Sequence, residues 1–208
     1  MSWNGTAAGG GTGIPEWSRA DRAKAAAKLM AGWVALLWAL EGLDLATGHA
    51  LDAYGIVPRE TSELPHLVSA AFLHFGFGHV ASNSVPLLVL GFLAALGGIR
   101  RFLGVVAVIV VADGLGVWLF SPSGTNTAGA SGVVFGLFGY LVVRGFVNRR
   151  PLEVLVGLAV AALWGGSMIA GVVPQAGISW QGHFFGLLAG AGAAFLLRRR
   201  PGPAALEA

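Results

Sequence analysis

Ser131 and His183 are the residues of this sequence best suited to nucleophilic chemistry. Ser131 stands among small residues in the run 129–132, and His183 stands in an otherwise apolar segment. A histidine within reach of a serine hydroxyl can act as its general base, and such a dyad needs no carboxylate. We therefore predict a Ser–His dyad. The competing interpretations are a small packing residue for Ser131 and a buried histidine bonded to a backbone carbonyl for His183.

Two more polar side chains could stabilise an oxyanion beside this serine. His79 and Asn83 are spaced i, i+4 and share one helix face. Together with the backbone N–H of Ser131 at the start of a helix, they could donate hydrogen bonds to a developing negative charge. The alternative role for His79 and Asn83 is hydrogen bonding between helices.

A zinc site is the other use for His74, His79 and His183. The two-histidine helical motif of zinc proteases is not matched, because the i+4 partner of His79 is Asn83. The chain has no cysteine, which excludes thiolate catalysis and zinc–sulfur sites. We therefore expect no metal and no cofactor. A structural role is favoured for His74, and Asp113 could orient a base or pair with a backbone group.

The composition places these polar residues in a membrane. The chain has 208 residues, of which 55% are hydrophobic and 11% charged, and its mean hydropathy is +0.73. A soluble domain carries about 25% charged residues. The isoelectric point near 10.0 does not indicate nucleic acid, because the basic residues flank apolar segments, as membrane insertion requires. We predict an integral membrane protein whose surroundings are the lipid bilayer.

Six apolar segments predict an all-α, polytopic, six-transmembrane-helix bundle. They span about 25–43, 77–97, 102–120, 129–147, 152–171 and 182–197. We expect residues 1–24 to form a disordered cytoplasmic tail, residues 25–200 the six-helix domain, and residues 201–208 a C-terminal tail. The long connection 44–76 mixes charged and apolar residues, so we expect it to lie at the membrane interface.

Lysine and arginine residues set the expected orientation. They cluster before the first segment, between the second and third, between the fourth and fifth, and after the sixth, whereas the opposite loops carry only Arg59. The positive-inside rule then puts both termini in the cytoplasm. The compact, Ala/Gly-rich chain further leads us to expect a bacterial cell membrane.

The same arginines give the depth of the two candidate residues. Ser131 lies thirteen residues before Arg144, and His183 lies fifteen before Arg198. At 1.5 Å per residue these offsets correspond to roughly 20 Å and roughly 22 Å, so the two side chains are expected at one level.

Glycines are placed to bring the two helices together. Gly186 and Gly190 follow His183 at i+3 and i+7, and Gly132 and Gly136 form a GxxxG pair. Small residues allow helix backbones in membranes to approach closely. We therefore expect these glycines to hold the nucleophile and the base close together.

Taken together, the motifs resemble the rhomboid intramembrane serine proteases. That family has Gly-x-Ser-Gly at the start of the fourth transmembrane helix, a histidine with small residues at i+3 and i+7 on the sixth, and His-x-x-x-Asn on the second. The matching residues here are Gly129, Ser131 and Gly132; His183, Gly186 and Gly190; and His79 and Asn83. The resemblance covers about residues 25–200, and three motifs in the right order make it specific.

The resemblance implies a serine endopeptidase that cleaves transmembrane-protein substrates within or near the bilayer. Ser131 would be the nucleophile and His183 the general base and later the acid. His79, Asn83 and the Ser131 N–H would form the oxyanion hole. It also implies a water-filled cavity open to the outside, a membrane-embedded first loop at 44–76, a mobile cap at 172–181, and the fifth helix as a gate.

Two positions depart from the family pattern. The aromatic residue four positions after the serine is commonly tyrosine; here it is Phe135, which could stack on His183 but offers no hydroxyl. A tryptophan–arginine pair common in the first loop is absent. The alternative functions are a catalytically inactive rhomboid-like protein that binds transmembrane clients, and a small transporter, which the lack of paired broken helices disfavours. The oligomeric state stays open.

Overall fold

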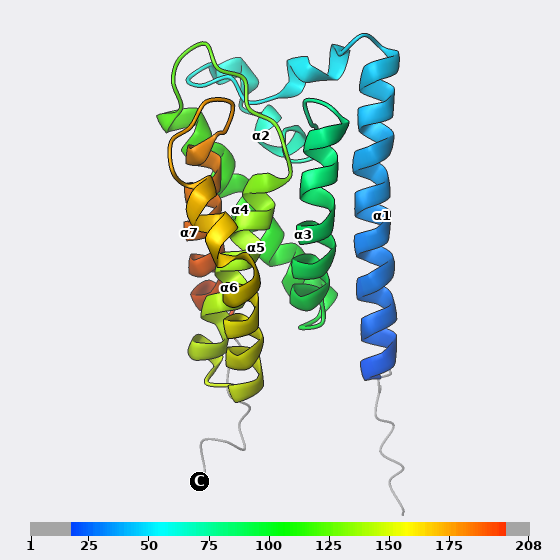
Figure 1. Cartoon of the computed structure of the whole chain (residues 1–208), viewed down its shortest axis with the longest axis vertical. Helices are drawn as coiled ribbons and strands as arrows, with labels where there is room; N and C mark the ends of the chain where they lie inside the picture. Colours follow the sequence, from blue (N-terminus) through cyan, green and yellow to red (C-terminus); the bar gives the residue numbers. More distant parts are fainter. Residues whose placement is uncertain (1–17, 199–208) are drawn as a thin grey trace, which may run out of the picture.

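A computed structural model of the chain describes residues 18–198. Within that range every regular element is helical, as Figure 1 shows. The elements are α1 (Arg19–Ala46), η1 (Ala50–Tyr54), η2 (Thr61–Glu63), α2 (His66–Ser69), α3 (Phe77–Ala95), α4 (Ile99–Phe120), α5 (Ser131–Asn148), α6 (Pro151–Gly171) and α7 (Trp180–Leu196). The all-α prediction is confirmed.

The six long helices coincide with the six predicted segments. Five of those described, α1, α3, α4, α5 and α6, are long and apolar enough to cross a membrane. The sixth, α7, has 17 residues and packs against α4 and α5. Apart from α1, each helix begins and ends within three residues of its expected bounds.

The first helix starts earlier than the sequence indicated. We expected a disordered tail through residue 24, but α1 begins at Arg19. Ser18 caps it by accepting a hydrogen bond from the Asp21 N–H at 3.1 Å, and such a cap satisfies one of the unpaired N–H groups of a helix start. The rest of the expected N-terminal tail, and the expected tail at 201–208, lie outside the described residues.

Helix α5 is the centre of the bundle, and α1 stands at one side (Figure 1). α5 contacts α3, α4, α6 and α7, whereas α1 packs mainly against α3. α6 is the least enclosed: Leu152 and Leu163 are each 73% exposed, as expected for side chains that face lipid. α5 therefore lies inside the bundle, α3 and α7 pack against it, and α6 faces largely outward.

Glycines let α7 lie directly against α5, but the pattern differs in detail from the expected one. A β-carbon on Gly186 or Gly190 would overlap the carbonyl of Gly132 or Gly136, respectively. The α-carbons of Gly132 and Gly136 instead open toward α4, where Asp113 and Ile109 fill the space. The α7 glycines thus make the α5–α7 contact, whereas the α5 GxxxG pair admits two α4 side chains.

The first loop is tied to the segment that leads into α5. Ile56 and Thr127 form an isolated antiparallel bridge, with N···O distances of 2.8 and 3.0 Å. The Gly129 N–H donates to the Ala70 carbonyl at 2.8 Å. Arg59 reaches the end of α4, where it donates to the Ser121 carbonyl at 2.8 Å. These contacts fix residues 127–130, and hence the position at which α5 begins.

Candidate active site

A cavity of about 930 Å³ lies beside the first loop and the starts of α5 and α7. The end of the bundle that carries the first loop is at the top of Figure 1. It is lined by the start of α3, the last third of α4, the start of α5, the start of α7, the first loop, and the segments before α5 and α7. All four predicted site residues line it: Ser131, His183, His79 and Asn83. Residues 174–181 of the expected cap line it too, apart from Ala176.

Ser131 is the first residue of α5. The two residues before it are held by backbone contacts, because the Gly129 N–H donates to Ala70 and the Ala130 N–H donates to His74 Nε2 at 3.2 Å. A helix start leaves N–H groups without intrahelical partners and carries a partial positive charge. The Ser131 side chain therefore enters the cavity next to a cluster of backbone donors.

His183 is oriented from two sides. Its Nδ1 lies 2.8 Å from the carbonyl oxygen of Gly171, the last residue of α6. A carbonyl can only accept, so Nδ1 carries the proton and Nε2 keeps its lone pair. The ring stacks on Phe135 of α5, with centroids 4.0 Å apart and planes at 4°. The imidazole is thus fixed in the tautomer that a general base requires.

His79 and Asn83 border the serine from α3. A β-carbon at Gly129 would lie 2.9 Å from His79 Nε2 and 3.7 Å from the Ser131 hydroxyl oxygen, so the absence of a side chain leaves room between them. Gly129 has φ +139°, which also favours glycine. Asn83 is 6% exposed, and its Nδ2 has no hydrogen-bond partner within residues 18–198. An amide donor without a partner beside a nucleophile is suited to binding an oxyanion.

His74 has the structural position that the sequence favoured. It lies just before α3, is 2% exposed and accepts the Ala130 N–H. Burial, with a smaller contribution from the neighbouring His79 charge, lowers the pKa of His74 to about 4. The ring is therefore neutral near pH 7, and its Nε2 remains an acceptor for the backbone that leads to Ser131.

Asp113 of α4 also lines the cavity, with its carboxylate against the α-carbon of Gly132. Its Oδ1 lies 3.2 Å from where a β-carbon of Gly182 would stand, and it has no hydrogen-bond partner in the described part of the protein. The carboxylate contacts neither the Nδ1 of His183, which is bonded to Gly171, nor a backbone donor. Neither role considered for it from the sequence is therefore seen.

Comparison with known proteins places the chain in a family. The family model for the rhomboid domain matches residues 61–200. The chain belongs to the rhomboid family. That match begins in the first loop, includes all four site residues, and covers five of the six long helices. The chain is thus a multi-pass integral membrane protein with a rhomboid fold.

Several relatives are similar over most of their length. A protein of Mycobacterium tuberculosis strain H37Rv, named as uncharacterised, is 40% identical over 174 residues, which cover 79% of this chain and 72% of the relative. A protein of Mycobacterium leprae with the same kind of name is 38% identical over 174 residues, covering 79% and 68%. A Bacillus subtilis protein, named provisionally as a rhomboid protease, is 30% identical over 154 residues, covering 71% of each chain.

Sequence reasoning named four side chains that line one cavity, but it missed part of what positions them. Gly171 was overlooked, since a backbone carbonyl leaves no signal in a sequence. The link from His74 to Ala130 was missed for a similar reason: the acceptor is visible, but the backbone donor is not. The stack of Phe135 on His183 was expected, because an i+4 position on α5 lies one turn below Ser131.

Proposed function

We propose that this rhomboid is an active intramembrane serine endopeptidase that cleaves transmembrane-protein substrates with Ser131 and His183. The observation that carries the proposal is the orientation of His183. Gly171 and Phe135 hold it in the tautomer of a general base, and it lines the same cavity as a serine at a helix start. A purely structural histidine would need the hydrogen bond to Gly171 but not the shared cavity.

The proposed reaction is an acyl transfer to serine followed by hydrolysis. His183 Nε2 takes the proton of the Ser131 hydroxyl as its oxygen attacks the scissile carbonyl carbon. The oxyanion accepts hydrogen bonds from the Ser131 N–H, Asn83 and His79. His183 then gives its proton to the leaving amine as the C–N bond breaks. A water molecule, deprotonated by the same imidazole, releases the new carboxyl end and regenerates the serine.

The proposal includes the orientation of the protein in the membrane and the kind of substrate that reaches the cavity. The arginines at the ends of α5 and α7 opposite the cavity support cytoplasmic termini, which puts the cavity mouth on the outer face of the cell membrane. A substrate would reach it from the lipid bilayer, so the peptide bond cut lies within or near a transmembrane segment. The mycobacterial relatives are consistent with a bacterial membrane.

Covalent labelling tests the dyad. The solubilised protein is treated with a fluorophosphonate probe, and labelling is expected to vanish in Ser131→Ala and in His183→Ala. Ser121→Ala is the matched control, because Ser121 lines the same cavity and its hydroxyl has no hydrogen-bond partner in the part of the chain that the structure describes. Labelling that survives loss of Ser131 would overturn the proposal. If the folded wild-type protein is neither labelled by the probe nor able to cleave a substrate, the alternative of an inactive, client-binding rhomboid is favoured.

The oxyanion role of Asn83 is tested separately. Asn83→Ala is expected to lower kcat by about ten- to a thousandfold with little change in KM, the range seen when one oxyanion donor is lost. Turnover of a model transmembrane substrate in detergent measures it. Turnover within twofold of wild type would remove Asn83 from the oxyanion hole while leaving the dyad intact.

A further inference from the structure

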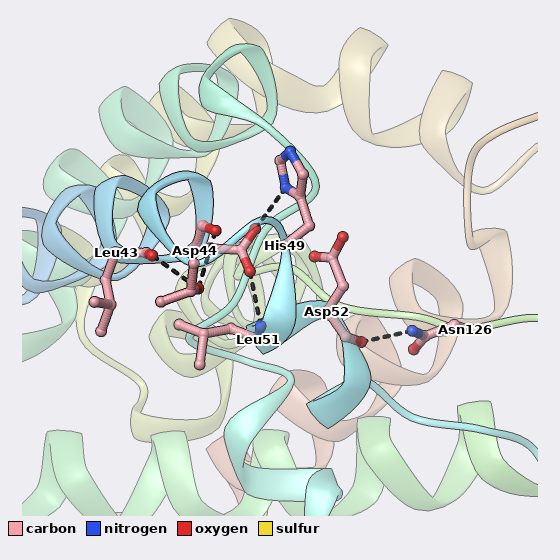
Figure 2. Close-up of polar contacts among 7 residues, drawn as sticks. Leu43, Asp44, His49, Leu51, Asp52 and Asn126 are labelled. Atoms are coloured by element: carbon pink, nitrogen blue, oxygen red, sulfur yellow. Dashed lines mark hydrogen bonds and ion pairs between the residues drawn. The ribbon is translucent and has the colours of Figure 1, made fainter.

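A second cluster of chemically active side chains lies outside the cavity, where α1 ends and the first loop begins (Figure 2). It consists of Asp44 at the end of α1, His49 in the turn, and Asp52 in η1. One possible ligand atom from each residue lies within 4.8 Å of the others. None of the three lines the active-site cavity, and the dyad chemistry makes no use of them.

The cluster is held together by one contact between side chains and one hydrogen bond from the backbone. Asp44 Oδ2 lies 2.8 Å from His49 Nδ1, and Asp44 Oδ1 accepts the Leu51 N–H at 2.8 Å. His49 adopts a left-handed conformation with φ 65°, which is uncommon for a residue with a side chain. That conformation turns the imidazole back over the end of α1 toward the Asp44 carboxylate (Figure 2).

A buried carboxylate one turn earlier is the independent sign of a missing ligand. Glu41 is 2% exposed, and its Oε2 has no hydrogen-bond partner among the described residues. It is three residues before Asp44 on the same face of α1, and its carboxylate also meets the backbone N–H of Gly76. A buried charge is costly unless it is paired or coordinates a metal.

The charges of this region do not balance within the described chain. Glu41, Asp44 and Asp52 are three carboxylates, and the one ion pair that the described residues form with them is His49 with Asp44. Both Glu41 and Asp44 are 2% exposed. A bound cation of charge +2 would supply the compensation that a single imidazole does not.

We propose that Asp44, His49 and Asp52 form a binding site for a divalent transition-metal ion of the Zn²⁺ type, with Glu41 as a supporting negative charge. Imidazole suits Zn²⁺ and its neighbours, and carboxylates complete a mixed nitrogen and oxygen set. Ca²⁺ takes six to eight oxygen ligands, which this cluster does not supply. The site differs from the expectation of no metal, which considered only the cavity histidines.

The position of the site gives it a structural consequence. The Asp52 backbone carbonyl accepts a hydrogen bond from Asn126 Nδ2 at 2.7 Å, and Asn126 lines the active-site cavity (Figure 2). A metal held by Asp44 and Asp52 would thus join the end of α1 to η1, and through η1 to the rim of the cavity. Binding should stabilise the folded protein by mass action.

Zinc titration of the full chain in detergent tests the proposal. Calorimetry is expected to show one saturable Zn²⁺ site per chain, with a zinc-dependent rise in Tm. Asp52→Asn and His49→Gln should each weaken binding by about tenfold or more. Asp52→Asn is the cleaner variant, because its carboxylate makes no hydrogen bond that the structure records, so its Tm without zinc should match wild type.

Two controls separate this site from other histidines. His66→Gln removes the imidazole of another histidine–carboxylate pair in the first loop, His66 with Glu63 at 2.5 Å, and should leave zinc binding unchanged. His183→Ala removes a cavity histidine and should also leave it unchanged. The proposal would be overturned if zinc binding survived Asp52→Asn and His49→Gln, or if it were lost in His183→Ala. It would also be overturned if the site preferred Ca²⁺ over Zn²⁺, or if no saturable binding were seen.

Discussion

Ser131 and His183 line one cavity, but the molecule holds them in different ways. Ser131 stands at the start of the central helix, and the two residues before it are fixed through backbone N–H groups that donate to Ala70 and His74. His183 is oriented by one carbonyl, that of Gly171, and one ring, that of Phe135.

The two supports differ in how firmly they are themselves embedded. α5 is enclosed by four helices, whereas α6, which supplies Gly171, faces largely outward. The proposed nucleophile is thus positioned by the core of the bundle, and the proposed base by its periphery. We therefore expect the orientation of His183 to be more easily disturbed than that of Ser131, as long as the α5–α7 contact stays intact.

Gly190→Ala is expected to have the largest effect, because it breaks the contact that holds the two regions together. The new β-carbon would overlap the Gly136 carbonyl, and backbone cannot move aside cheaply. Overpacking typically costs about 1–3 kcal/mol, so Tm should fall and cleavage should drop more than tenfold. Gly192→Ala is the control on the same helix, since nothing lies within 4 Å of its β-carbon position. Equal behaviour of the two variants would refute this account of the contact.

Phe135→Leu should give an intermediate effect confined to the base. An aromatic stack contributes about 0.5–1.5 kcal/mol beyond its buried area, so loss of the stack should lower kcat about two- to tenfold. Phe135→Tyr keeps the ring and serves as the control, with activity near wild type. If Phe135→Leu left kcat unchanged but lowered Tm, Phe135 would act only in packing and would not orient His183.

His74→Gln should have the smallest effect near pH 7, because the change in the support of Ser131 should appear only in acid. The pKa of His74 is about 4 in the folded protein, against an ordinary value of 6.5. Between these values the unfolded chain binds a proton that the folded protein does not, so stability is complete above pH 6.5 and falls as the pH drops toward 4.

At pH 5 the loss attributable to His74 is about 1–2 kcal/mol. Thermal unfolding of wild type and His74→Gln from pH 7.5 to 5 measures it, and the variant should show a shallower decline. His79 is present in both proteins, so the difference isolates His74. If the stability of the two proteins falls in parallel with pH, the pKa of His74 is the same in the folded and unfolded states.

The sequence predicted the parts of this molecule that depend on periodicity and hydropathy. Six apolar segments predicted six long helices, and the i+3, i+7 glycines after His183 correctly predicted the face of α7 that meets α5. The α5 glycines were harder to interpret, because a GxxxG pair does not specify which neighbour it faces. The first loop could not be predicted, since its helices are short and its bridges to residues 127–130 are long-range.

Gly171 has an electrostatic consequence that follows from its place in the chain. As the last residue of α6, it belongs to the helix end at which unpaired carbonyls carry about half a negative charge. That partial charge points at the proton-bearing nitrogen of His183 and would favour the imidazolium that the proposed reaction forms when Ser131 loses its proton. In serine proteases with a triad this task falls to an aspartate. Here the end of a helix would perform it, without placing a formal charge in the membrane.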